Sequence, residues 1–224
     1  MNISTTYEKA HLNNRQYILP ISLFQLVRRV LELEDSQKPI LNLIEIGCGQ
    51  GTLFSKFLDH GHNFVGIDIS KTAIQRARAY EKRMPFYCLD VRDIELMDQR
   101  FDIFVDSHLL HCLGSLKSVQ EYLLKLKSVA KPGARIIIET MVISKGLLKS
   151  DSMCSDDGYI IKDLLGVGRR IIFDGRFIEN LVLKLGFRID YMNFPVGAKF
   201  VLDGKRVESL ESDPDVIQLI LRVP

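Results

Sequence analysis

The sequence predicts an α/β protein whose mostly parallel sheet is covered by helices on both faces. Three observations favour this fold class. Short apolar runs of β type alternate with stretches of helical periodicity along most of the 224 residues. A glycine-rich turn, Gly47 to Gly51, joins the first such run, 43–46, to a helical pattern. A Pro-Gly turn at 132–133 then joins a later helical pattern to a strand, as helix-stop chemistry requires.

The remaining elements follow in order. Residues 1–38 show helical periodicity, with Pro20 placed near a helix start and Pro39 at its end. Ser70 is a good N-cap for the helix after the second strand. We expect strands over 64–67, 86–89, 101–106, 134–140, 187–191 and 216–223, helices over 53–58, 70–82, 116–130 and 175–185, an irregular stretch over 141–173, and a hairpin or loop over 196–214.

Composition limits the class of partner. The length suits one α/β domain with a full hydrophobic core, and 46% hydrophobic with 26% charged residues is ordinary for a globular protein. Lys and Arg number 30 against 28 Asp and Glu, a net charge of +2. So small an excess gives no electrostatic case for a nucleic acid or a membrane as the main partner. Monomer and homodimer both stay open.

The cysteines and the N-terminus indicate a compartment. Cys48, Cys88, Cys112 and Cys154 are scattered, without C-x-x-C or zinc spacing, and 156–157 lacks the alternating ligands of a calcium loop. We therefore expect reduced thiols and no metal. The first eleven residues lack a signal-peptide core, and no apolar run is long enough to span a bilayer. A cytoplasmic protein is expected.

The glycine turn indicates a nucleoside cofactor. Gly47, Gly49 and Gly51 allow a ligand to approach the backbone closely. About twenty residues on, Asp68 ends the second strand, where a carboxylate can accept both hydroxyls of a ribose. The dinucleotide pattern G-x-G-x-x-G/A is a poorer match, because Thr52 holds its third small position and Glu45 would repel a pyrophosphate.

The run 45–51 reads E-I-G-C-G-Q-G and matches E/D-x-G-x-G-x-G at every fixed position. In this the sequence resembles the class I S-adenosylmethionine-dependent methyltransferases, strongly over 40–126 and loosely elsewhere. The resemblance implies a Rossmann-like seven-stranded sheet whose last strand inserts antiparallel between the fifth and sixth. It implies one domain over 1–224, with a helical lid over 1–38 and an acceptor-pocket insertion over 141–173. The implied reaction moves a methyl group from the sulfonium to an O, N or S nucleophile and leaves S-adenosylhomocysteine.

The resemblance also implies a cofactor site. Asp90 would take the adenine amino group and the Val91 amide a ring nitrogen, although Asp90 also suits a loop acid or a helix cap. Asp106 would hold the cofactor's ammonium group or orient a substrate. The full set of cofactor residues is Glu45, Gly47, Cys48, Gly49, Gly51, Asp68, Ile69, Asp90, Val91, Asp106 and Ser107.

The resemblance also implies which segments face the acceptor, and residue type selects the candidates within them. His108 and His111 are the candidate bases, against the alternative of packed histidines. Candidate acceptor contacts are Tyr7, His11, Tyr17, Tyr159, Arg169 and Arg170. An arginine suits a carboxylate or phosphate on the acceptor. The alternatives are a helix packed on the sheet for the N-terminal residues and a solvated loop for the later ones.

The acceptor class follows by comparison within the resembled family. The N/D-P-P-Y/F motif of enzymes that methylate nucleic-acid amino groups is absent, since D-S-H-L stands at 106–109. No double-glutamate loop of arginine methyltransferases is evident. We therefore expect a small-molecule acceptor. Two other classes remain: a non-catalytic S-adenosylmethionine-binding regulatory protein and, less favoured, an NAD-dependent oxidoreductase.

Overall fold

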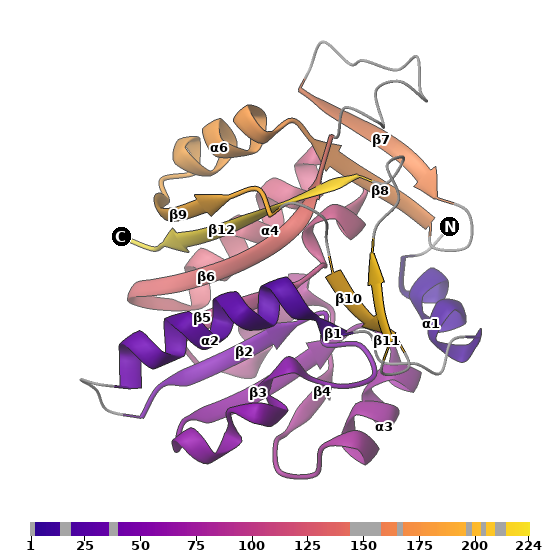
Figure 1. Ribbon diagram of the computed structural model, residues 1–224, viewed down its shortest axis with the longest axis vertical. Coiled ribbons are helices and arrows are strands. Elements are labelled where there is room, and N and C mark those ends of the chain that lie inside the picture. The colour runs from indigo at the N-terminus through magenta and orange to yellow at the C-terminus, as the bar shows by residue number, and fades with distance from the viewer. Residues whose placement is uncertain are drawn as a thin grey trace.

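The computed structural model describes residues 3–13, 19–35, 40–143, 158–164, 168–195, 199–202, 205–208 and 214–224. A central sheet runs through it in the order β4-β3-β2-β5-β6-β12-β9 (Figure 1). The strands are β2 (Asn42–Ile46), β3 (Asn63–Asp68), β4 (Phe86–Cys88), β5 (Phe101–Ser107), β6 (Ala130–Val142), β9 (Arg188–Asn193) and β12 (Asp215–Arg222). β2 to β6 pair in parallel, and β12 is antiparallel to both neighbours. The predicted sheet and its antiparallel last strand are confirmed.

Helices cover both faces of this sheet. They are α1 (Ile3–Asn13), α2 (Ile21–Asp35), α3 (Lys71–Tyr80), α4 (Leu116–Val129) and α6 (Gly175–Lys184). α2 and α3 pack into one hydrophobic core, and α4 and α6 pack into the other, on the opposite face. In Figure 1, α2 lies in front of the strands and α4 lies behind them. Both α2, which follows Pro20, and α3, which Ser70 caps, begin where the sequence predicts.

The prediction of a helix after the glycine turn is wrong. The chain instead forms two 3-10 turns, η1 (Leu53–Lys56) and η2 (Leu58–His60). Thr52 caps the first, but Phe57 at φ −117° interrupts the run, and Gly61 at φ 76° ends the second. Leu53 and Phe54 are still buried, so these apolar side chains pack into the core from 3-10 turns rather than from a regular helix.

The prediction of an irregular stretch over 141–173 is also wrong in its second half. β7 (Tyr159–Leu164) and β8 (Gly168–Phe173) form an antiparallel hairpin, and β8 joins the central sheet beside β6. Ile160, Ile171, Ile172 and Phe173 are all buried, so β-branched and aromatic side chains drive the pairing. The polar cluster at 150–157 lies outside the described residues.

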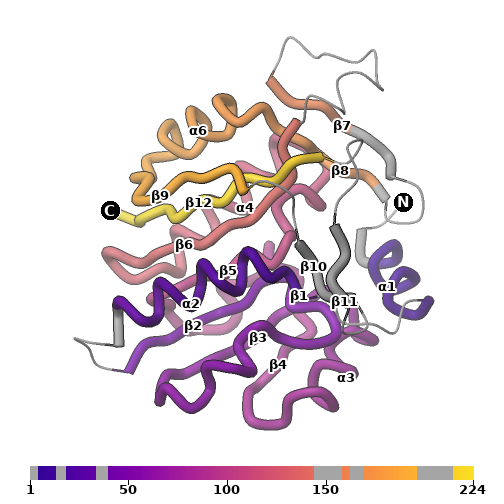
Figure 2. The backbone as a smooth tube through the Cα atoms, viewed as in Figure 1, coloured from indigo at the N-terminus to yellow at the C-terminus, as the bar shows by residue number. Residues whose placement is uncertain are grey.

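The N-terminal segment divides into two helices with different surroundings. α2 buries Leu23, Val27 and Leu31 against the sheet. α1 lies instead beside α3, where Glu8 accepts a hydrogen bond from the Ser70 hydroxyl at 2.7 Å. Figure 2 shows the two helices as separate parts of the trace.

A small antiparallel sheet completes the described structure. β1 (Leu19–Pro20) pairs with β10 (Lys199–Leu202), which pairs with β11 (Lys205–Glu208). The hairpin expected within 196–214 is therefore present, although its turn at 203–204 lies outside the described residues.

Candidate functional site

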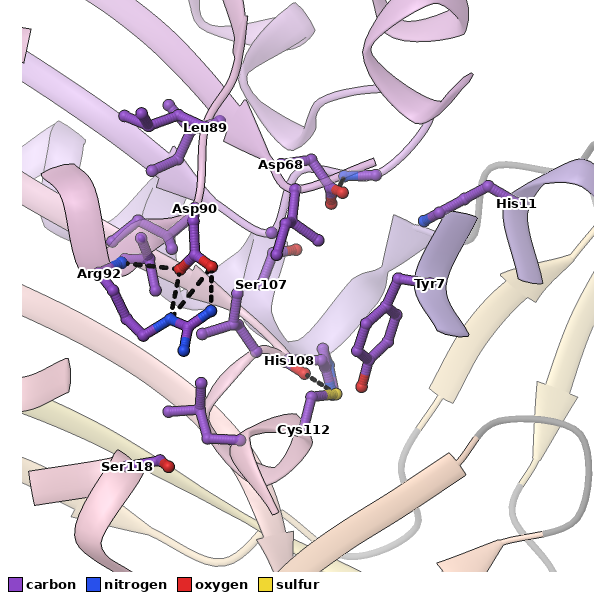
Figure 3. Close-up of a pocket in the computed structure, with 18 residues that line it drawn as sticks. Tyr7, His11, Asp68, Leu89, Asp90, Arg92, Ser107, His108, Cys112 and Ser118 are labelled. Carbon is purple, nitrogen blue, oxygen red and sulfur yellow. Dashed lines mark hydrogen bonds and ion pairs between the residues drawn. The ribbon is translucent and has the colours of Figure 1, made fainter. Parts of the chain in front are cut away.

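A pocket opens at the carboxyl ends of β2, β3, β4 and β5, the edge where open α/β sheets bind ligands (Figure 3). Two 3-10 helices frame it, η3 (Val91–Met97) and η4 (Leu110–Leu113), and α1 forms one wall. Its lining residues are Tyr7, His11, Ile46, Gly47, Gly49, Ile67, Asp68, Ile69, Leu89, Asp90, Val91, Arg92, Ser107, His108, Leu109, Cys112, Leu113 and Ser118.

The glycine turn shapes the floor of this pocket. Gly47 and Gly49 have φ values of 70° and 61°, which L side chains rarely adopt. A Cβ on Gly47 would also lie 3.2 Å from the Leu109 Cβ. Cys48 is buried beneath the turn, and neither it nor Gly51 lines the pocket. Of the predicted loop residues, Gly47 and Gly49 are therefore the ones that a ligand can reach.

Asp68 presents its carboxylate to the pocket with half of its acceptor capacity in use. Its Oδ2 accepts from the Gly49 amide at 3.0 Å, and its Oδ1 accepts from the Ser70 amide at 2.8 Å. Burial raises the pKa of Asp68, and these two amides oppose the rise. Each carboxylate oxygen can accept two hydrogen bonds, so the described residues leave one position on each oxygen for a ligand hydroxyl.

Glu45 does not line the pocket. Its side chain is fully buried, and its Oε2 accepts from the Thr52 hydroxyl at 2.5 Å and from the Leu53 amide at 3.1 Å. Burial raises the pKa of Glu45 to about 8. The structure thus places this predicted cofactor residue beneath the turn, where it holds the chain that follows Gly51.

Asp106 is likewise a supporting residue. It is fully buried, accepts from the Tyr122 hydroxyl at 2.7 Å, and accepts from the amides of Leu109 and Leu110 at 2.6 and 3.3 Å. Burial raises its pKa to about 6. It does not line the pocket, and its hydrogen bonds fix the turn that carries Ser107 and Leu109.

Asp90 and Val91 line the pocket as predicted, but Asp90 already has a partner. The Arg92 guanidinium donates to both carboxylate oxygens, with Nε to Oδ1 at 3.0 Å (Figure 3). Burial alone would raise the pKa of Asp90, and the Arg92 hydrogen bonds lower it below its ordinary value. Val91 begins η3, so its amide has no intrahelical acceptor and is available to a ligand.

His108 enters the pocket from the turn after β5, in the left-handed region at φ 65°. Its Nε2 lies 3.0 Å from Oε1 of Glu139, a fully buried residue whose Oε2 accepts from the Gln218 amide at 2.7 Å. Burial would raise the pKa of Glu139, but its hydrogen bonds and the charge of His108 hold it below the ordinary range. A carboxylate fixed in this way orients the His108 ring.

His111 does not reach the pocket. It is buried, and its Nδ1 lies 3.2 Å from the Thr140 hydroxyl and 3.4 Å from the Met141 amide nitrogen. Since that amide can only donate, Nδ1 is the acceptor and the ring is neutral. Burial lowers the pKa of His111 well below its usual value. This geometry fits the alternative of a packed histidine and leaves the His111 ring out of reach of a methyl acceptor in the pocket.

α1 brings Tyr7 and His11 into the pocket wall (Figure 3). A Cβ on Gly49 would lie 3.6 Å from the His11 Cε1, so the ring covers the glycine turn. The Arg76 guanidinium ties the end of α1 to α3 by donating to the His11 carbonyl. α1 therefore contributes to the pocket wall, whereas α2 packs on the sheet, and the lid role stays a prediction.

The other predicted acceptor residues lie elsewhere. Tyr17 is outside the described residues. Tyr159 packs its ring against Phe173 and Phe177, and Arg169 is exposed beside Gly114. None of these described side chains lines the pocket. Arg170 is buried behind Tyr7, and its Nη1 donates to the Tyr7 hydroxyl at 3.0 Å.

Sequence reasoning missed several pocket residues. Arg92, Leu109 and Cys112 line the cavity, and Gln218 fixes Glu139 from a strand 79 residues further along the chain. The spacing of Arg92 from Asp90 is a weak signal of a side chain that folds back on its own turn. Nothing local signals Gln218, because its contact depends on where β12 inserts.

The described residues offer neither a metal site nor a membrane-spanning helix. No group of three or more His, Cys, Asp and Glu side chains in the described ranges is placed to hold a metal ion. None of the described helices has the length and apolar character needed to cross a membrane.

Comparison with known proteins identifies the family. A family model described as a methyltransferase domain matches residues 37–168. The 2-heptyl-1-hydroxyquinolin-4(1H)-one methyltransferase of Mycobacteroides abscessus is 30% identical over 137 residues, 59% of each chain. A ubiquinone biosynthesis O-methyltransferase of Rhodopseudomonas palustris is 30% identical over 105 residues, 45% of this chain and 40% of that protein. The chain thus spans roughly half the length of these curated relatives.

Solved structures show the same fold at low identity. An S-adenosylmethionine-dependent methyltransferase from Methanosarcina mazei superposes with a TM-score of 0.61 at 17% identity, covering 85% of this chain and 95% of that one. The N-methyltransferase NodS of Bradyrhizobium japonicum, in complex with S-adenosylhomocysteine, gives 0.58 at 16% identity, covering 90% and 88%. The family match over more than half of the chain and the shared sheet order lead to one conclusion: this chain belongs to the class I S-adenosylmethionine-dependent methyltransferases.

Proposed function

We propose that this protein binds S-adenosylmethionine in the pocket beside the glycine turn and transfers its methyl group to an O, N or S nucleophile of a small-molecule acceptor. One observation carries the proposal. Asp68 offers one remaining acceptor position on each carboxylate oxygen, beside a turn whose two glycines leave the backbone open. Two hydroxyls on neighbouring carbons of a ribose match two adjacent acceptors.

The other lining residues support the same ligand. The Val91 amide suits the acceptor nitrogen of an adenine ring, and the apolar side chains of Ile67 and Leu89 suit its faces. Asp90 can receive the adenine amino group only by sharing oxygens that Arg92 already contacts. We therefore propose that Arg92 is part of the adenine subsite and that Ile69 and Ser107 line the rest.

Bound S-adenosylmethionine supplies an activated methyl carbon on a sulfonium. The protein's task is then to align the acceptor with that carbon and to exclude water. α1 serves both needs, since Tyr7 and His11 close one side of the pocket. We propose His108, oriented by Glu139, as the group that takes the acceptor's proton where the acceptor must lose one.

The acceptor is proposed to be small because two of the curated relatives are named for a heptyl-hydroxyquinolinone and for ubiquinone biosynthesis. We also propose a cytoplasmic location, which the free thiols of the three described cysteines support.

Calorimetric titration with S-adenosylmethionine, S-adenosylhomocysteine and NAD in parallel tests the proposal. Micromolar binding of the first two, without NAD, would support it, and binding of NAD alone would refute it. Release of S-adenosylhomocysteine with a panel of hydroxylated and amino-substituted aromatic acceptors then tests catalysis. Tight cofactor binding with no turnover across the panel would favour the non-catalytic regulatory alternative.

A further inference from the structure

Arg170, in β8, is a buried cation whose contacts with the described residues include no acid. Only 7% of the residue is exposed. Its Nη1 donates to the Tyr7 hydroxyl at 3.0 Å and to the Arg169 carbonyl at 3.1 Å, and its Cζ lies 5.7 Å from the centre of the Tyr7 ring. Within the described ranges, no aspartate or glutamate forms an ion pair with it.

Other arginines of the described structure make the contrast clear. Arg83, Arg92 and Arg222 each pair with a carboxylate, although their side chains are 53%, 59% and 31% exposed. These three better-solvated guanidinium groups have acidic partners. The exposed Arg78 and Arg100 bond to backbone carbonyl oxygens, and the more deeply buried Arg170 has no acidic partner among the described residues. Removing an ion from water is costly, and a cation–π contact offsets only part of that cost. Within the part of the chain that the structure describes, two neutral acceptors and one ring leave the Arg170 charge incompletely compensated.

The position of Arg170 indicates which part of a bound ligand would supply an anionic partner. Its hydrogen-bond partner Tyr7 lines the pocket, and the Tyr7 hydroxyl lies beside the Cys112 sulfur, which also lines it (Figure 3). Asp68 and Asp90 mark the nucleoside side of the same cavity. Arg170 therefore lies behind the wall that faces the proposed acceptor rather than behind the ribose or the base.

We propose that Arg170, together with the Tyr7 hydroxyl, binds a carboxylate group of the methyl acceptor. This inference rests on the proposed methyltransferase function and names the substrate class: a small, largely apolar molecule that carries a planar oxyanion. The guanidinium has further N–H groups beyond the one used by Tyr7, and its planar fork matches a carboxylate. Burial raises the pKa of Tyr7, so its hydroxyl stays protonated and can donate.

A purely structural role for Arg170 makes the opposite prediction about stability. If Arg170 only fastens α1 to β8, its replacement by methionine should destabilise the unliganded protein. If the charge is retained for a ligand, Arg170→Met keeps the apolar stem, removes an uncompensated charge, and should leave the unliganded protein at least as stable. The neighbouring exposed Arg169 provides the matched control, Arg169→Met.

The experiment measures binding of benzoate and quinoline-2-carboxylate against their carboxamides, with and without S-adenosylhomocysteine. We expect at least one carboxylate to bind the wild-type chain about 10- to 100-fold more tightly than its amide. Arg170→Met should lose that preference, Arg170→Lys should keep part of it, and Arg169→Met should keep all of it. Denaturant unfolding of each unliganded variant is measured in parallel.

Equal binding of acid and amide, absence of binding by both acids, or an unchanged preference in Arg170→Met would overturn the proposal. A lower free energy of unfolding for unliganded Arg170→Met would also overturn the proposal, unless Arg170→Lys is stable and still prefers the carboxylate to its amide. Titration of the wild-type chain with S-adenosylhomocysteine distinguishes failure of the proposed function from failure of the Arg170 proposal. If S-adenosylhomocysteine does not bind, the cofactor assignment is rejected. The comparison of acids with amides in the absence of S-adenosylhomocysteine still tests Arg170.

Discussion

Replacement of Glu45 by glutamine should change how the stability of this protein depends on pH. Burial raises the pKa of Glu45 from 4.5 to about 8 in the folded state. Between these two values the folded chain holds a proton that the unfolded chain has released. The contribution of this carboxyl to stability is therefore complete below pH 4.5, declines as the pH rises, and is lost above pH 8.

The size of the effect follows from the same two pKa values. Between pH 5 and pH 8, the decline attributable to this one group is about 3–4 kcal/mol. Glutamine keeps an oxygen that can accept from the Thr52 hydroxyl and the Leu53 amide, but it does not titrate. We expect Glu45→Gln to be less stable than wild type near pH 5 and to gain on it steadily toward pH 8.

The assay is urea unfolding of both proteins at pH 5, 6, 7 and 8, with the difference in free energy of unfolding taken at each pH. Other titrating groups cancel in this difference. Glu121→Gln, an exposed position on α4, is the control and should show no comparable trend. A Glu45→Gln difference that stays constant from pH 5 to pH 8 would mean that Glu45 is already ionised when buried, and the reasoning would fail.

Three further outcomes are expected. Asp68→Ala should weaken S-adenosylmethionine binding by about 1–3 kcal/mol in calorimetry, because the two hydroxyl contacts are lost; an unchanged dissociation constant would exclude the ribose assignment. Gly66→Ala should cost about 1–3 kcal/mol in unfolding experiments, since a Cβ there would lie 2.6 Å from the Phe86 Cδ1, and Phe86→Leu should recover part of the loss. Tyr122→Phe should cost about 1–3 kcal/mol at pH 8, where Asp106 is ionised, and less at pH 5; equal costs at both pH values would contradict the raised pKa of Asp106.

The sequence predicted the parts of this structure that are set by local spacing. Gly47, Gly49 and Asp68 follow directly from strand ends, and the parallel order of the strands brings them to one edge. The acids Glu45 and Asp106 carry the same kind of local signal, yet their side chains turn into the core. Spacing along a strand locates a residue, but packing decides whether its side chain reaches the ligand or supports the turn.

Long-range contacts were beyond prediction for a related reason. The burial of Arg170 depends on α1 and β8, which lie more than 150 residues apart in the sequence and meet at Tyr7, 163 positions from Arg170. The β7–β8 hairpin was missed because the polar run before it suggested a loop throughout. The 3-10 turns after Gly51 were missed because apolar spacing at 53, 54 and 57 fits both kinds of helix.

The placement of α1 has a kinetic consequence. Neighbouring residues of this helix contact opposite sides of the pocket rim: Glu8 bonds to Ser70 and Thr72 at the start of α3, and Tyr7 bonds to Arg170 in β8. With α1 closing one side of the pocket as proposed, a ligand held beneath the helix is released when these contacts break. The exchange of spent for fresh cofactor should therefore follow a first-order opening step, with a rate that stops rising once cofactor is in excess. In such an enzyme, the residence time of the product sets the turnover number.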